Sequence, residues 1–92
     1  MAAFVALLTF SEDEELRLKT RPTHREYLRG LYDAGKLRTS GPWADDTGAM
    51  LIYEAVDLAE AQQLLDNDPY RRAGVLADAR LREWKIVLPP AE

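Results

Sequence analysis

The stretch AFVALLTF, Ala3 to Phe10, is a β-prone run of strand length in which apolar residues follow one another without polar alternation. Such a pattern predicts a strand that is buried on both of its faces. A second nearly continuous apolar run spans residues 49–56, and a short alternating run over residues 37–41 is ended by Gly41-Pro42. Alternation over residues 80–88 predicts a fourth strand, which the following prolines end.

Two helices are predicted between these strands. The first spans Thr20 to Gly35, with Pro22 in its first turn, Gly35 at its C-terminal cap, and an acidic linker before it. Its apolar stripe comprises His24, Tyr27, Leu28, Leu31 and Tyr32. The second helix opens on a capping box formed by Asp57 and Glu60, ends near Asp68, and has Leu58, Ala61, Leu64 and Leu65 on one face. Asp68-Pro69 then predicts a short helical turn that closes near Gly74.

The resulting order is β-α-β-β-α-β, which is the ferredoxin-like α+β pattern with an antiparallel sheet. Residues 1–92 are expected to form a single domain, because no linker or repeat interrupts them. Two helices cover only one face of such a sheet, whereas the first and third strands are apolar on both faces. We therefore expect a second copy of the chain to cover the other face, giving a dimeric α+β barrel as a homodimer or a higher oligomer of it.

Composition excludes several classes of function. Twelve basic and 16 acidic residues give a net charge of -4, which argues against nucleic acid as a partner. There is no cysteine, so disulfides, thiolate catalysis and cysteine zinc sites are excluded. One histidine and scattered carboxylates predict no metal site, and dispersed glycines predict no nucleotide cofactor. The apolar start lacks a basic segment and runs into acidic residues, so we expect a cytoplasmic protein without a membrane partner.

The only histidine, His24, lies on the apolar stripe of the first helix. An unperturbed imidazole titrates near neutral pH, which makes His24 the natural candidate for a general acid or base. The competing interpretation is a core residue with one nitrogen bonded to a nearby carbonyl. A catalytic role needs an orienting acceptor, and Asp68 is the candidate, although a simple N-cap explains Asp68 as well.

Other polar and aromatic residues complete the candidate site. Ser40 lies near the end of a predicted strand, and together with His24 and Asp68 it supplies the residue types of a catalytic triad. No nucleophile-elbow glycines surround Ser40, which disfavours a serine hydrolase. Arg21 lies one turn before His24 near the predicted helix N-terminus, where it could hold a carboxylate or phenolate. The remaining arginines of its stripe, at 17, 25 and 29, are interpreted as a solvated face paired with Glu26 and Asp33. Trp43 and Tyr70 are either aromatic walls of a pocket or ordinary core residues.

Three blocks of this sequence resemble the signature blocks of the YciI-like (YCII-related) family: RLKTRPTH at 17–24, GKLRTSGP at 35–42 and DPYRRAGV at 68–75. The resemblance implies a dimeric α+β barrel with a pocket in which His24 and Asp68 form a catalytic dyad. Arg21, Ser40 and Tyr70 match the blocks as neighbouring substrate-binding residues. A relative that dehydrochlorinates a chlorinated hydroxyhydroquinone, and fold relatives such as muconolactone isomerase, imply proton transfer on small oxygenated rings. The segment 43–47 is shorter than the loop that many members carry there.

Three functional hypotheses follow. The first is a cofactor-independent lyase or isomerase in which His24 moves a proton, Asp68 orients the imidazole, and Arg21 or helix-end amides hold an anionic oxygen of a small metabolite. The second is a non-catalytic dimeric module that binds a small molecule in the same pocket. The third is a purely structural dimer.

Overall fold

The computed structural model describes residues 1–90 and has the predicted element order. The strands are β1 (Ala2–Phe10), β2 (Leu37–Pro42), β3 (Gly48–Ala55) and β4 (Leu76–Trp84). The helices are α1 (Glu14–Asp33), α2 (Leu58–Asp66) and α3 (Pro69–Arg72). The α+β class and the ferredoxin-like order are therefore confirmed. No helix within residues 1–90 is both long enough and apolar enough to cross a membrane.

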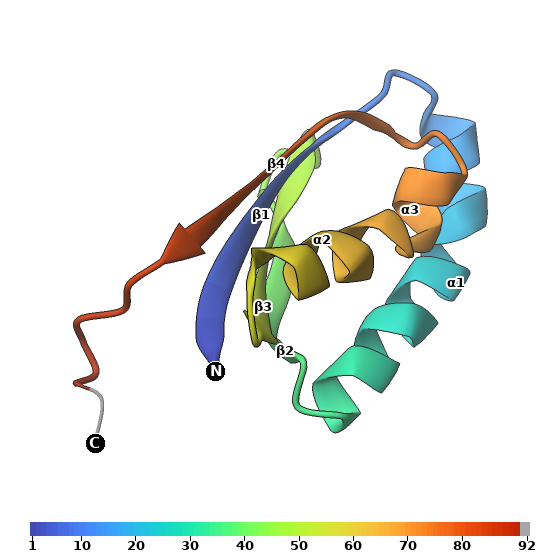
Figure 1. The fold of residues 1–92 in the computed structure, drawn as a ribbon. Coiled ribbons are helices and arrows are strands. Elements are labelled where there is room, and N and C mark those ends of the chain that lie inside the picture. The colour runs from blue at the N-terminus through green and yellow to red at the C-terminus, as the bar shows by residue number, and fades with distance from the viewer. Residues whose placement is uncertain (91–92) are drawn as a thin grey trace.

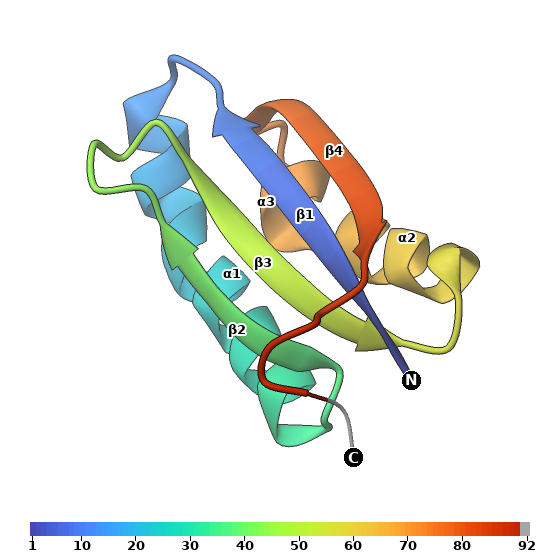
Figure 2. The same cartoon turned by 90° about the vertical axis from the view of Figure 1, so that its left-hand side faces the viewer.

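The four strands form one antiparallel sheet in the order β2-β3-β1-β4. All three helices pack on one face of this sheet, and the other face is left without a helix (Figures 1 and 2). The two long apolar strands, β1 and β3, are adjacent at the centre. Both runs therefore occupy the positions in the sheet that bury the most surface.

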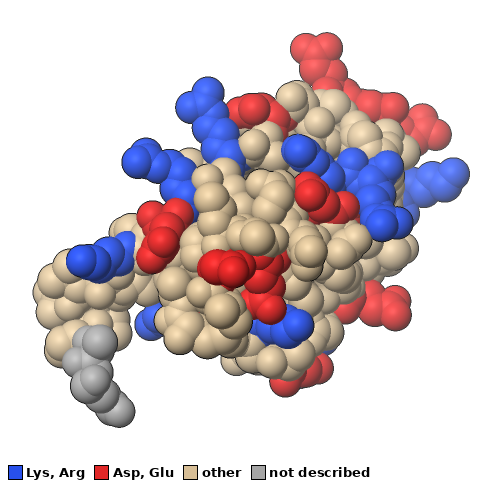
Figure 3. All heavy atoms as spheres, viewed as in Figure 1, with Lys and Arg blue, Asp and Glu red and all other residues tan. Residues whose placement is uncertain are grey.

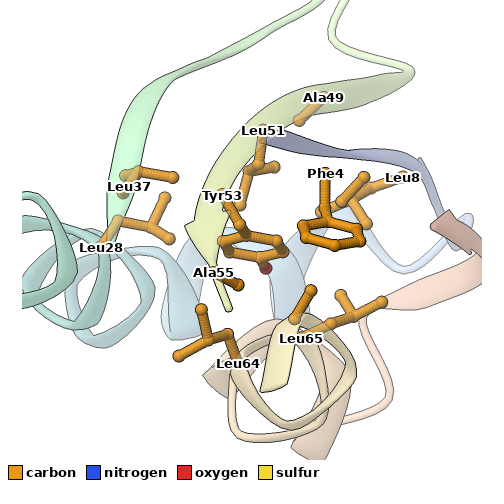
Figure 4. Close-up of a cluster of buried hydrophobic side chains, with 12 residues drawn as sticks. Phe4, Leu8, Leu28, Leu37, Ala49, Leu51, Tyr53, Ala55, Leu64 and Leu65 are labelled. Atoms are coloured by element: carbon orange, nitrogen blue, oxygen red, sulfur yellow. The ribbon is translucent and has the colours of Figure 1, made fainter. Parts of the chain in front are cut away.

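The core lies between the sheet and the helices. The pairing of β1 with β3 shows which strand residues face it. Phe4 of β1 is paired with Tyr53 of β3, and the next pairs on the same face are Ala6 with Leu51 and Leu8 with Ala49. Figure 4 shows Phe4, Leu8 and Tyr53 from the strands together with leucines from the helices. The largest helix contributions are Leu28, Leu64 and Leu65. A hydrogen bond from the Tyr27 hydroxyl to the Leu64 carbonyl, 2.7 Å long, also joins α1 to α2.

Helix α1 is longer than predicted, because it begins at Glu14 rather than Thr20. The Asp13 side chain caps it by accepting a hydrogen bond from the Leu16 amide at 3.0 Å, and the acidic residues that follow favour the positive end of the helix dipole. Pro22 is therefore inside the helix, and its placement in a first turn was wrong. Tyr32 was also misplaced, since its side chain is exposed and lies beside Arg29.

Two further predictions at element ends were wrong. Strand β4 spans Leu76–Trp84 instead of residues 80–88, because it pairs along the whole of β1 and already reaches Ala3 with Trp84. The alternation continues past Trp84, but no strand remains there to pair with it. In α2, Ala61, Leu64 and Leu65 are buried as predicted, whereas Leu58 at the first position is exposed. Asp57 caps α2 as predicted by accepting from the Glu60 amide, whereas the Glu60 side chain accepts from the Val56 amide and not from that of Asp57, so the capping box is formed only in part.

The helix-free face of the sheet carries apolar side chains along its centre. Val5 is paired with Ile52 and Leu7 with Met50, and Trp84 lies beside Ala3. Leu7 is 40% exposed and Trp84 is 46% exposed. The C-terminal segment after β4 leaves the sheet on this side, passing in front of the sheet in Figure 2 and projecting away from it in Figure 1. The chain therefore exposes large apolar side chains on the face that the sequence predicts to be covered.

Candidate active site

The His24 imidazole is buried and is hydrogen bonded to a buried carboxylate. Its Nδ1 atom lies 2.7 Å from Oδ1 of Asp68. The residue is only 7% exposed, and Asp68 is 0% exposed. A carboxylate can only accept hydrogen bonds, so this geometry assigns the proton of the neutral ring to Nδ1. The other ring nitrogen, Nε2, is then the atom with a free lone pair.

Asp68 is held by backbone as well as by His24. It is the N-cap of α3, and its Oδ1 atom accepts a hydrogen bond from the Tyr70 amide at 2.9 Å. Pro69 at the first helical position fixes the direction of the chain at this point. The N-cap prediction for Asp68 is therefore correct, and the same oxygen that caps α3 also contacts the imidazole. One carboxylate oxygen thus makes the contacts that both alternatives require, the cap of α3 and the hydrogen bond to His24.

Tyr70 fixes the plane of the imidazole. Its ring is stacked on the His24 ring with the centroids 3.7 Å apart and the planes 5° from parallel. The edge of Phe10 meets the Tyr70 ring in a T-shaped contact with a centroid distance of 5.6 Å. Since the Tyr70 amide also bonds to Asp68, this one residue constrains both partners of the His24 contact.

A cleft of about 310 Å³ opens beside His24, between α1 and the part of the sheet formed by the edge strand β2 and its neighbour β3. We call it the α1 cleft. Of the residues that the sequence proposes for the site, Arg21, His24, Ser40 and Tyr70 line it. Asp68 does not line the cleft, because it lies fully buried behind His24.

Some predicted features are not at this site. Trp43 is not among the residues that line the α1 cleft; it borders a separate groove with Met50 and Ile52. No hydrogen bond joins Ser40 to His24 in the described part of the chain, so a serine triad is not formed. Because α1 begins at Glu14, its N-terminal end is nearly three turns from His24 and does not form the expected anion site there.

The interpretation of the arginine stripe as a solvated face holds for only part of it. Arg29 is paired with Asp33 at 3.2 Å. Arg17 and Arg25, in contrast, line the α1 cleft together with Arg21. The sequence could have predicted this, because a spacing of four residues from Arg21 places all three arginines on one face of the helix.

Burial raises the pKa of the nearby tyrosines. The pKa of Tyr53 is raised strongly, mainly because its hydroxyl is removed from water and secondarily because Asp68 is negative. The pKa of Tyr70 is also raised by burial, against the opposing effect of Arg17, Arg21 and Arg25. Both phenols therefore stay neutral near pH 7, and neither supplies a phenolate to the site.

No cluster of metal-ligating side chains accompanies the cleft in the described part of the chain. Within residues 1–90 no three histidine or carboxylate side chains gather as metal ligands would. On the face in Figure 3, basic and acidic side chains are interspersed. The chemistry that the described residues offer here is that of an imidazole, its carboxylate partner and nearby guanidinium groups.

Solved structures with the same fold include a dehydrochlorinase and a monooxygenase. The 5-chloro-2-hydroxyhydroquinone dehydrochlorinase TftG of Burkholderia phenoliruptrix AC1100, in complex with 2,5-dihydroxybenzoquinone, superposes with a TM-score of 0.81 at 26% identity. The match covers 97% of this chain and 99% of that one. An antibiotic biosynthesis monooxygenase superposes with a TM-score of 0.64 at 14% identity over 95% of this chain and 99% of its own, a likeness of fold alone.

Sequence relatives point to one family. Protein YciI of Escherichia coli O6:H1 is 37% identical over 83 residues, covering 79% of this chain and 85% of the relative. A protein of Emericella nidulans described as derivative of benzaldehyde biosynthesis cluster protein C is 32% identical over 75 residues, covering 70% and 76% of the two chains. The model of the YCII-related domain matches residues 2–85. The chain therefore belongs to the YCII-related family.

Proposed function

We propose that this protein is a lyase or isomerase that moves protons on a small oxygenated ring compound, with His24 as the general acid and base. The observation that carries the proposal is the 2.7 Å contact between Nδ1 of His24 and Oδ1 of Asp68 beside the α1 cleft. An imidazole oriented by a buried carboxylate is a recurrent arrangement for proton transfer. The structural likeness to a dehydrochlorinase supports the reaction class.

Each residue has a definite part in this reaction. Nε2 of His24 takes a proton from a ring hydroxyl or carbon, and Asp68 stabilises the imidazolium that forms. In an isomerase the proton returns to another atom of the ring. In a lyase the proton is first returned to the ring carbon that bears the leaving group, and deprotonation of a second ring hydroxyl then expels the anion, such as chloride, from that carbon. Arg21 stabilises the negative charge that develops on the ring oxygen. Tyr70 acts as a positioning residue, because it stacks on the imidazole.

The test is turnover of 5-chloro-2-hydroxyhydroquinone, the substrate named for the structural relative, followed by chloride release and by mass spectrometry of the product. We expect His24→Gln to slow turnover about 100-fold or more, because a glutamine side chain cannot take up or release the proton. Glu26→Gln is the matched control, since Glu26 is exposed on the same helix and does not line the cleft. Equal turnover by His24→Gln and the control would refute the assignment of His24.

The second candidate function is a non-catalytic module that binds an anionic metabolite. The arginines that line the α1 cleft favour it, because they serve binding without any need for a titrating group. The two candidate functions differ in whether a product is formed. Ligand binding by the wild type with no product by mass spectrometry, and with an affinity that His24→Gln leaves unchanged, would favour the binding module.

We also propose that two copies associate through the helix-free face of the sheet. The exposed Leu7 and Trp84 side chains support this, together with the apolar Val5, Met50 and Ile52 beside them. Leu7→Arg is expected to convert a dimer into a monomer in light scattering after size-exclusion chromatography. Leu18→Arg is the matched control, because Leu18 is also 40% exposed but lies on α1. A monomeric wild-type protein would refute the proposal.

A further inference from the structure

One wall of the α1 cleft is formed by three arginines of the same helix. Arg17, Arg21 and Arg25 are separated by four residues each, and all three line the cleft. At a rise of about 1.5 Å per residue, their Cα atoms span about 12 Å along the helix. Guanidinium groups are therefore available both beside His24 and toward the Phe10 end of the cleft.

These three arginines form no ion pair with any described residue of the protein. The arginines that do meet a carboxylate are Arg29, Arg38, Arg71 and Arg80. Asp46 is the one acidic residue among those that line the cleft. The chain as a whole has a net charge of -4, so this excess of positive charge is local to the cleft. Uncompensated guanidinium groups facing one small volume repel each other and favour an anionic ligand.

The positive charges surround the groups proposed for catalysis. Arg21 and Arg25 flank His24 on α1, and Arg17, Arg21 and Arg25 each act to lower the pKa of Tyr70, whose ring is stacked on His24. The Arg17 guanidinium lies 5.2 Å from the centroid of the Phe10 ring. The cleft is therefore lined by the Arg17 guanidinium beside Phe10 and by Arg21 and Arg25, the arginines nearest to His24 along α1.

We infer that the ligand of the α1 cleft is a single-ring, planar compound with two separate oxyanion groups, one held beside His24 by Arg21 and Arg25 and the other by Arg17. A guanidinium fork binds one carboxylate or phenolate pair of oxygens, so three forks exceed what one oxyanion needs. A volume of about 310 Å³ suits a one-ring compound. The inference rests on the proposed function, because it takes the same cleft as the substrate site and narrows the substrate class to dianions.

The test compares the binding of isophthalate, a planar dianion, with that of benzoate, the corresponding monoanion, by isothermal titration calorimetry. We expect the wild type to bind isophthalate at least tenfold more tightly than benzoate, and the preference to weaken as salt is added. Arg17→Gln is expected to reduce this preference to about twofold or less. Circular dichroism should show that this variant keeps the fold. Arg29→Gln is the matched control, since it removes the same charge from the same helix outside the cleft.

Equal affinity of the wild type for the two acids would overturn the inference, and so would equal loss of preference in Arg17→Gln and Arg29→Gln. His24→Gln separates this failure from failure of the proposed function. A tenfold preference for isophthalate together with unimpaired turnover by His24→Gln refutes only the catalytic role of His24. If the preference is absent but turnover depends on His24, only the inference that the ligand is a dianion is refuted.

Discussion

Removal of the Asp68 carboxylate is expected to destabilise the protein by much more than removal of an ordinary helix cap. Asp68→Ala deletes the acceptor for the Tyr70 amide, which costs about 1 kcal/mol as an N-cap. It also leaves Nδ1 of the buried His24 without its partner, at a cost of about 1–3 kcal/mol. The free energy of unfolding should therefore fall by about 2–4 kcal/mol in total.

The molecule contains a matched control for this change. Asp57 is the N-cap of α2 and accepts a hydrogen bond from the Glu60 amide at 2.9 Å, but it contacts no imidazole. Asp57→Ala is expected to cost about 1 kcal/mol, the value of a cap alone. Urea denaturation of both variants, at one fixed protein concentration because association shifts apparent stability, measures the difference.

Two measurements tie the excess cost to His24. In a double-mutant cycle, His24→Leu with Asp68→Ala should be less destabilised than the sum of the single variants by about 1 kcal/mol or more, since both polar partners are then gone. The only histidine of the chain also gives an unambiguous nitrogen NMR signal, which should report a proton on Nδ1 and none on Nε2 at alkaline pH. If Asp68→Ala costs no more than Asp57→Ala, or if the proton is on Nε2, the reasoning is refuted.

Three further predictions concern the fold. Tyr53→Phe should raise the free energy of unfolding by about 1 kcal/mol, because the buried hydroxyl of Tyr53 has no hydrogen-bond partner among the described residues. Burial raises the pKa of Tyr53 above the unfolded value of about 10, so above that pH ionisation of Tyr53 favours the unfolded state. The free energy of unfolding should then fall by up to about 1.4 kcal/mol per pH unit, and denaturation between about pH 9 and 11 should show a shallower fall for Tyr53→Phe. Gly48→Ala should destabilise by about 2 kcal/mol or more in thermal melts, since a Cβ at Gly48 would lie 2.0 Å from the backbone oxygen of Leu8; a neutral result would contradict the close approach of β1 and β3. Asp13→Ala should lower the helix signal of α1 and the free energy of unfolding by about 1 kcal/mol, and no change would mean that Asp13 is not the cap.

The sequence alone determined the order of the elements and most of the polar residues that meet at the cleft. The unbroken apolar runs around Leu8 and Leu51 carry apolar side chains on both faces, which a strand can bury best at the centre of a sheet, and that is where both strands lie. The cap signals at Asp57 and Asp68 are local, since a side chain and an amide two or three residues away suffice to form them. For this reason they could be read without knowledge of the fold.

What only the tertiary structure decided are the contacts between distant segments. The end of β4 at Trp84 is set by the length of β1, with which it pairs, and not by its own alternating pattern. His24 and Asp68 are 44 residues apart, so only the packing of α1 against α3 brings Nδ1 within 2.7 Å of the carboxylate. The same packing turns Arg17 and Arg25 toward the cleft, whereas Arg29 on the same stripe pairs with Asp33 outside it. Periodicity gives the face of a helix on which a residue lies, but what that face meets depends on the segments that the fold packs against it.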